Sequence, residues 1–273
     1  MLGDRFTFIV CKSTHSNVLK GVMMLVLFAA LFSSPQARTH DALDNARQIV
    51  VVTTADWTSV SGMLQQFERS SSGGEWKAVG PAFPIVVGKT GLAWGSGLVT
   101  NEKLGASIGD PIKKEGDGKA PAGVFSLGTA FGYEPQALAR SRLPYLHLTA
   151  SVECVDDAKS RYYNRIVDRQ NIGAPDWNSS EHMLRDDELY HWGVAVNHNV
   201  NPVRPGGGSC IFMHIWRAAG EGAVGCTAMP KDDVERLIEW LDPAKSPLLV
   251  QMPLGQYDKL RKHLASFRLP PAQ

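Results

Sequence analysis

Short apolar segments bounded by glycine, proline or serine are the feature of this sequence that most limits its possible folds. Apolar and polar residues alternate at residues 146–154 and 190–196, and apolar or β-branched residues fill 48–54, 211–216 and 248–252. Such segments are typical of β-strands, and strict alternation marks strands that are buried on one face. The 26 glycines and 16 prolines form about 15% of the chain, against a usual share of roughly 12%. The sequence therefore predicts a mainly β, turn-rich fold.

Helical periodicity occurs mainly near the C-terminus. A helix is predicted to begin at Pro230, because apolar residues follow at the i, i+3, i+4, i+7 positions Val234, Leu237, Ile238 and Leu241. A second helix is predicted within 257–267. Residues 156–185 are polar and match no regular element, and we expect a long excursion near the functional site. The expected organisation is one β-rich domain at residues 45–255, followed by a C-terminal helix and tail at 256–273.

Residues 1–37 carry the pattern of an export signal. The apolar run from Val22 to Phe32 follows Lys12 and Lys20 and precedes small and polar residues at 33–37. This run is shorter than the stretch of about 20 residues that spans a bilayer. Pro35 is unfavourable for cleavage after Ala37, so both a cleaved signal peptide and an uncleaved N-terminal anchor remain open. We expect an exported protein of the periplasm or cell envelope, an oxidising compartment.

Composition and charge exclude several classes of protein. With 44% hydrophobic and 20% charged residues the chain can bury a sizeable core, which argues against disorder. The formal net charge of +1 supplies no general attraction to nucleic acid or to an anionic membrane, and no basic patch compensates. We expect no nucleic-acid partner, a membrane contact only through an uncleaved N-terminal segment, and a monomer. No histidine or cysteine pair has tight metal-ligand spacing.

The segment 208–230 is the most informative for chemistry. A strand with period two places Cys210, Phe212, His214 and Trp216 on one face and aliphatic residues on the other. A glycine-rich loop then leads to Gly225 and Cys226, four residues before the helix expected at Pro230.

These residues support a catalytic interpretation of Cys226. A helix N-terminus stabilises a nearby thiolate, and Gly225 permits a tight turn that could direct backbone N–H groups toward an oxyanion. His214 would complete a Cys–His pair. The spacing alone is weak evidence, because a histidine followed twelve positions later by a cysteine is more often a core histidine and a cysteine in a disulfide.

Three segments together resemble the L,D-transpeptidase (YkuD-like) family. They are the glycine-aspartate turn at 114–125, which leads through proline and glycine into a strand, the segment at 190–197, and the histidine strand followed by Gly225-Cys226. The resemblance extends over residues 110–253, and any one motif without the others would be weak. It implies a β-sandwich-like catalytic domain with a few peripheral helices that acts on peptidoglycan stem peptides.

The resemblance also implies roles for individual residues. Cys226 would attack the acyl carbonyl of a diamino acid joined to a terminal D-alanine, and His214 would act as base and then acid. The N–H groups of Gly225 and Cys226 would form the oxyanion hole, with no metal or organic cofactor. Four residues are candidate substrate contacts: Tyr190, His191, Trp216 and Arg217. The alternatives are a carboxypeptidase or amidase-type hydrolase that uses the same Cys and His, and a non-catalytic cell-wall-binding module.

The sequence departs from the family pattern around the nucleophile. Ala223 and Val224 stand where the family usually has serine or threonine and often histidine, and Thr227, Ala228 and Met229 replace the asparagine or arginine that commonly follows the cysteine. Both changes lie where substrate is held. We expect Arg217 either to supply the missing carboxylate contact or to be a solvated loop residue. His191 either lines the cleft or faces solvent.

The four cysteines limit the possible disulfides. Cys11 lies in the export segment and is lost if that segment is cleaved. If Cys226 is the nucleophile it must stay free, so Cys154 and Cys210 are the one remaining possible pair. Both fall on expected strands, and either a bridge or two unpaired cysteines fits the sequence.

Overall fold

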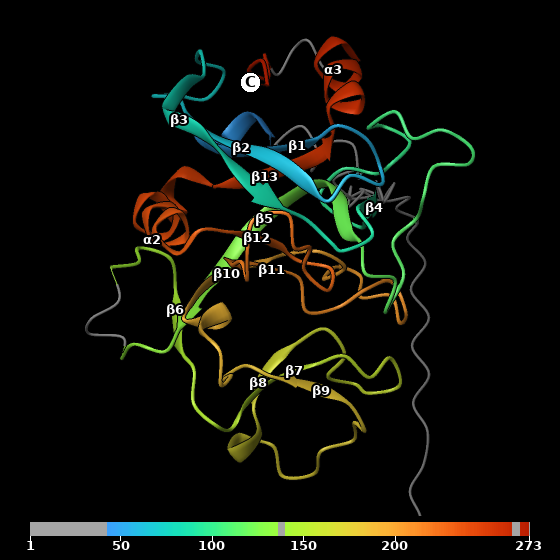
Figure 1. The fold of residues 1–273 in the computed structure, drawn as a ribbon, viewed down its shortest axis with the longest axis vertical. Coiled ribbons are helices and arrows are strands. Elements are labelled where there is room, and N and C mark those ends of the chain that lie inside the picture. The colour runs from blue at the N-terminus through green and yellow to red at the C-terminus, as the bar shows by residue number, and fades with distance from the viewer. Residues whose placement is uncertain (1–42, 136–139, 264–267, 273) are drawn as a thin grey trace, which may run out of the picture. The chain divides into compact units, whose positions relative to one another are not determined.

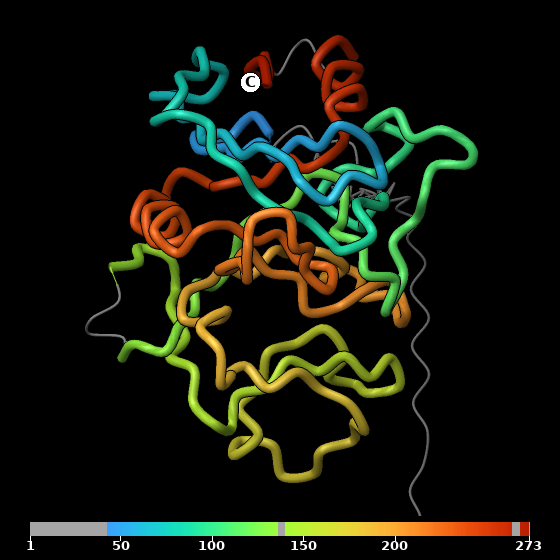
Figure 2. Tube along the Cα trace, in the orientation of Figure 1, coloured from blue at the N-terminus to red at the C-terminus, as the bar shows by residue number. Residues whose placement is uncertain are grey.

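A computed structural model describes residues 43–135, 140–263 and 268–272 (Figures 1 and 2). The expected export segment at 1–37 lies outside the described residues. The strands are β1 (Gln48–Thr54), β2 (Ser61–Glu68), β3 (Lys77–Val86), β4 (Leu92–Trp94), β5 (Ala120–Gly132), β6 (Tyr145–His147), β7 (Val152–Val155), β8 (Ile166–Asp168), β9 (Ser180–His182), β10 (Trp192–Val196), β11 (Phe212–Ile215), β12 (Thr227–Met229) and β13 (Leu248–Pro253). The helices are α2 (Lys231–Trp240) and α3 (Leu254–His263), and short 3-10 turns cover Arg169–Asn171, Glu188–Tyr190 and Pro243–Lys245. Within the described residues no helix is both long enough and apolar enough to cross a membrane.

The main sheet closes on itself. Its strands follow the order β10-β11-β12-β3-β2-β1-β13-β5, and β5 also pairs with β10. The β3–β12 junction is the narrowest, since it rests on the single register pair Val86 and Ala228. β1 pairs in parallel with β13, and β11 pairs in parallel with β12. The prediction of a mainly β fold with a few peripheral helices is confirmed, and the expected sandwich-like sheet takes the form of this closed ring.

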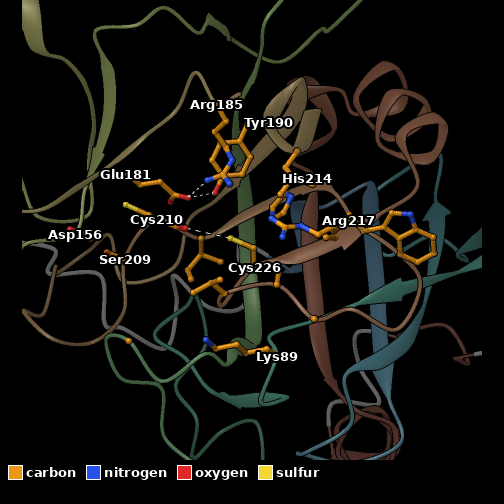
Figure 3. Close-up of a pocket in the computed structure, with 18 of the residues that line it drawn as sticks. Lys89, Asp156, Glu181, Arg185, Tyr190, Ser209, Cys210, His214, Arg217 and Cys226 are labelled. Atoms are coloured by element: carbon orange, nitrogen blue, oxygen red, sulfur yellow. Dashed lines mark hydrogen bonds and ion pairs between the residues drawn. The ribbon is translucent and has the colours of Figure 1, made fainter. Parts of the chain in front are cut away.

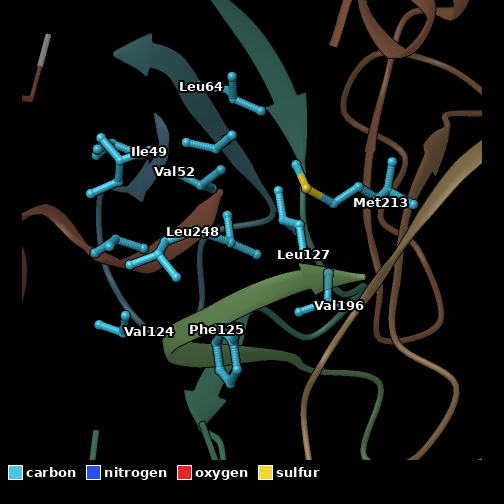
Figure 4. Packing of buried hydrophobic residues seen from close by; sticks show 14 of the residues in the cluster. Ile49, Val52, Leu64, Val124, Phe125, Leu127, Val196, Met213 and Leu248 are labelled. Atoms are coloured by element: carbon cyan, nitrogen blue, oxygen red, sulfur yellow. The ribbon is translucent and has the colours of Figure 1, made fainter. Parts of the chain in front are cut away.

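The core explains why these segments form strands. β1 is buried at all seven positions, with the main core and α3 packed against it, which accounts for the β-branched run from residue 49 to 54. Figure 4 shows aliphatic side chains from several strands meeting in this core, among them Ile49, Leu64 and Leu248. α2 adds its apolar face, and α3 adds Tyr257 and Leu260, so the C-terminal helix belongs to the same core. The helix predicted from Pro230 is confirmed, with Pro230 as its N-cap residue.

A second, smaller sheet has the order β8-β7-β9 (Figure 1). A second buried cluster lies between it and the main sheet and contains Phe131, Cys154, Met183, Tyr190 and Phe212. A disulfide joins Cys154 in β7 to Cys210 just before β11. The cysteine pair left open by the sequence is therefore bridged. Two of the small sheet's strands fall inside residues 156–185, where the sequence predicted no regular element.

The prediction of one strand over residues 146–154 is wrong. β6 pairs with β5 of the main sheet, whereas β7 belongs to the small sheet. Between them the Val152 N–H donates to the Thr149 carbonyl at 3.0 Å, closing a turn. The apolar alternation continues through this turn, so the sequence does not reveal that the chain passes from one sheet to the other.

The alternation at 190–196 is also interrupted. Asp187 caps the 3-10 turn Glu188–Tyr190 by accepting the Leu189 N–H, and β10 begins only at Trp192. This turn breaks the alternation of side chains between two faces, so residues before and after it do not share a face. Val194 and Val196 therefore point into the main core, whereas Tyr190 packs in the second cluster.

Candidate functional site

A cavity of about 660 Å³ lies beside the second cluster. Its walls come from several parts of the chain: residue 89, residues 113–116, residues 156–190 of the small-sheet excursion, and residues 209–228, which include β11 and the start of β12. Figure 3 shows the Cys226 and His214 side chains close together in the middle of this region, with Glu181 and Tyr190 on one side and Lys89 on the other. The expected excursion near the site does line the cavity.

Cys226 is the free cysteine of the described residues and is buried. Its Sγ accepts the Phe212 N–H at 3.3 Å, and the thiol donates to the Cys210 carbonyl at 3.5 Å. Burial, followed by the negative charge of Glu181, raises the pKa of the Cys226 thiol to about 12. The thiol is therefore neutral at pH 7 in this structure.

His214 is placed on the same face as Cys226 by strand register. β11 and β12 are parallel, with His214 beside Ala228, so Cys226, two residues before Ala228, points to the side on which His214 lies. His214 Nδ1 lies 2.7 Å from the Ile215 carbonyl oxygen, which assigns the proton to Nδ1 and leaves Nε2 as a base. Burial lowers the pKa of His214 to about 4. No described hydrogen bond joins His214 to Cys226, so the pair rests as neutral imidazole and neutral thiol.

The loop before Cys226 is held against the β3–β4 connection. The Lys89 N–H donates to the Ala223 carbonyl at 2.6 Å, and the Ala223 N–H donates to Val87. Gly225 has φ +124°, a conformation that favours glycine. Among the described residues none accepts a hydrogen bond from the backbone N–H of Gly225 or Cys226. Cys226 lines the cavity, whereas Gly225 lies just outside the lining.

The expectation that a helix N-terminus activates Cys226 is wrong. The strand β12 separates Cys226 from α2, and at about 3.3 Å per residue this distance exceeds the range of the helix dipole. The spacing of four residues predicted the helix correctly but could not show that the intervening residues are extended. Burial governs the pKa of the thiol instead.

Tyr190 supports the histidine. Its ring packs edge-on against His214 with centroids 5.1 Å apart, and its hydroxyl donates to Glu181 Oε1 at 2.5 Å. Arg185 lies over the same ring at 5.2 Å and forms a two-bond pair with Asp187, both distances being 2.8 Å. Tyr190 lines the cavity but is buried, with its hydroxyl already engaged.

The other candidate substrate contacts differ in position. Trp216 and Arg217 line the cavity, and Arg217 is 61% exposed at 3.6 Å from Glu221. His191 does not line it. Instead His191 lies between Glu134 and Glu188, with Nδ1 2.8 Å from the Glu188 carboxylate.

The glycine-aspartate turn is organised by Asp117. Its carboxylate accepts the Lys113 ammonium at 2.6 Å and the backbone N–H groups of Lys114 and Lys119 at 2.8 and 2.9 Å. The Lys113 side chain is buried and lines the cavity. Glu115, from the same turn, accepts the Ser209 hydroxyl at 2.8 Å. The turn thus forms the wall beside the disulfide.

Sequence reasoning missed Glu181 and Arg185, because single charged residues in a polar segment show no periodicity. The one available signal was the expectation that residues 156–185 lie near the site. Within the described residues, no three histidine, cysteine, aspartate or glutamate side chains gather closely enough to hold a metal ion.

No protein-family model matches this sequence, and no curated protein or solved structure is significantly similar to it.

Proposed function

We propose that this protein is an exported cysteine acyltransferase of the L,D-transpeptidase type that acts on peptidoglycan stem peptides. The observation that carries the proposal is one arrangement: a free thiol and a neutral imidazole line the same cavity, and the backbone N–H groups of Gly225 and Cys226 have no acceptor among the described residues. A nucleophile, a base and an oxyanion site are the three groups that acyl transfer through a thioester requires. The motifs at 114–125 and 208–230 support the choice of substrate.

The reaction begins with a proton transfer. His214 Nε2 takes the Cys226 proton as Sγ bonds to the acyl carbon, which avoids a free thiolate in the buried site. The carbonyl oxygen becomes negative and is stabilised by the N–H groups of Gly225 and Cys226. The protonated His214 then gives its proton to the departing D-alanine amine, leaving a thioester on Cys226. An amine or a water attacks this thioester, and Cys226 recovers its proton through His214.

The test is intact-mass measurement after incubation with a tetrapeptide donor. The expected product is a covalent adduct on Cys226 with release of D-alanine. Cys226→Ala should form none, and His214→Gln should slow acylation by about 10²–10⁴-fold. His182→Gln is the matched control, because His182 is exposed and does not line the cavity.

The products separate the alternatives. Cross-linked peptide in the presence of an amine acceptor supports a transpeptidase, whereas shortened peptide with and without the amine indicates a hydrolase. Peptidoglycan binding with no adduct indicates a binding module and contradicts the proposal. An adduct on any residue other than Cys226 also contradicts it.

A further inference from the structure

Glu181 is a carboxylate of the cavity for which the proposed mechanism has no use. It is the central residue of β9, and its side chain is 29% exposed, at the cavity wall. Oε1 accepts the Tyr190 hydroxyl, and no described residue donates a hydrogen bond to Oε2. Burial raises the pKa of Glu181, and the Tyr190 hydroxyl and Arg185 oppose that rise. One carboxylate oxygen is therefore available to a ligand.

Arg185 forms only a long ion pair with Glu181, without a hydrogen bond. Arg185 uses Nε and Nη2 on Asp187, and its Nη1 stays 3.8 Å from Glu181 Oε1, beyond hydrogen-bond distance. Lys113 is engaged by Asp117. Asp156, the next carboxylate at this wall, bonds only to the Ser179 hydroxyl at 2.5 Å, which does not remove its charge.

Glu181 also acts on the nucleophile through space. Its charge is the largest influence after burial that raises the pKa of Cys226, while the Phe212 N–H and Lys113 act in the opposite direction. A positive charge placed at Glu181 Oε2 would cancel the effect of the Glu181 charge on the pKa of Cys226. Cys226 and His214 line the same cavity and are both buried, so a ligand that enters it meets Glu181 and these two side chains together.

We propose that Glu181 is the subsite for a positively charged group of the substrate, in the same cavity as Cys226 and His214. The inference rests on the proposed function for its acyl-transfer step. It assigns the site a preference for substrates that carry an ammonium or guanidinium group near the acyl carbon.

Charged thiol reagents test the subsite without any acyl transfer. We would compare three methanethiosulfonates of similar size: cationic trimethylammonioethyl, neutral ethyl and anionic sulfonatoethyl. In each case the Cys226 thiolate attacks the sulfenyl sulfur, a disulfide forms and methanesulfinate leaves. At fixed pH and ionic strength, each rate is divided by the rate of the same reagent with 2-mercaptoethanol, because any thiolate prefers a cationic reagent. After this correction the cationic reagent should react at least about tenfold faster than the anionic one, as expected for one charge at contact distance in a partly buried site.

Two variants locate the source of that preference. Glu181→Gln keeps an acceptor for the Tyr190 hydroxyl but removes the charge, so the cation-to-anion ratio should fall about tenfold while the neutral reagent reacts faster. Glu221→Gln is the matched control. It removes the same charge from the cavity lip, where the Glu221 side chain is 52% exposed and therefore screened by solvent and salt, and it should change the ratio less than twofold.

The subsite proposal would be overturned if the cation-to-anion rate ratio fell equally in Glu181→Gln and Glu221→Gln, or if this ratio were near one in the wild-type protein. If Glu181→Gln raises the rates of all three reagents together, the substitution has made Cys226 more accessible. Glu181→Asp then tests the role of the charge, since it keeps the carboxylate and should keep the preference for the cationic reagent. Loss of the preference in Glu181→Asp, with the melting temperature and disulfide intact, also overturns it.

A donor peptide pair separates this inference from the proposed function. The tetrapeptide with a free side-chain amine should be used with about tenfold higher kcat/KM than its N-acetylated form, and Glu181→Gln should reduce that difference to less than twofold. Charge preference toward thiol reagents without any acyl-enzyme would retain the subsite and contradict the acyltransferase. Acylation of both peptides at equal rates would retain the acyltransferase and contradict the subsite.

Discussion

Breaking the Cys154–Cys210 disulfide is the perturbation with the largest effect that can be worked out from the structure. The bridge joins β7 of the small sheet to the segment before β11, and both cysteines are buried. It spans 56 positions of the chain. The small sheet has three short strands, so its own contacts are few, and the bridge fixes it beside Cys226 and His214.

The magnitude follows from loop closure. A bridge over a loop of this length removes unfolded-state entropy equivalent to about 4 kcal/mol at 25 °C. Replacing either cysteine by alanine also removes a buried sulfur, at a cost on the order of 1 kcal/mol. Each single variant should therefore lose about 4–5 kcal/mol, and the double variant should lose only about 1 kcal/mol more, because the bridge is broken only once.

Urea unfolding with and without dithiothreitol is the assay, with reduction carried out in the unfolded state before refolding. The wild-type chain should lose about 4 kcal/mol on reduction, and the variants should be insensitive to the reductant. Cys226→Ala is the matched control and should keep the full effect, since Cys226 is outside the bridge. A wild-type loss below about 1 kcal/mol would refute the reasoning.

Two further predictions concern buried groups near the site. Burial lowers the pKa of His198 to about 4, so the unfolded chain binds its proton more readily between pH 6.5 and 4 and stability falls as pH decreases through that window. His198 should account for about 2 kcal/mol of the loss by pH 5 in urea titrations, with a like amount from His214, whose pKa burial lowers in the same way. His198→Gln should therefore make the dependence of stability on pH shallower, and an unchanged slope would contradict this. Gly225→Ala should cost about 1–3 kcal/mol from its φ of +124° with no clash, since the added Cβ would lie 3.4 Å from the nearest atom. Gly105→Ala, at φ +86° in open space, should lose comparable stability in the same titration but leave Cys226 modification by iodoacetamide unchanged, and equal slowing in both would contradict a role for Gly225 at the thiol.

The β character of the chain and the two faces of β11 were predictable from local patterns. Ile211, Met213 and Ile215 do enter the main core, and Cys210 and Phe212 do enter the second cluster. These outcomes follow because a strand points successive side chains to opposite faces wherever it is placed. The helix after Pro230 was predictable for the same kind of reason.

The ring closure and the small sheet were not predictable. The β5–β10 and β3–β12 pairings join strands that are far apart in sequence, and no local period records which strands become neighbours. The small sheet uses strands of three or four residues, too short for a periodic signal. The 3-10 turn that redirects Tyr190 into the second cluster is likewise decided by the capping contact of Asp187.

At the site, residue chemistry singled out Cys226 and His214, because few side chains can act as nucleophile and base. Their environment came from packing. Burial makes both groups neutral, the Ile215 carbonyl selects the histidine tautomer, and Glu181 opposes the thiolate from a strand 45 positions earlier in the chain. Charge, solvation and hydrogen bonding depend on neighbours in space, and for a ring of long-range strand pairs those neighbours exist only once the chain has folded.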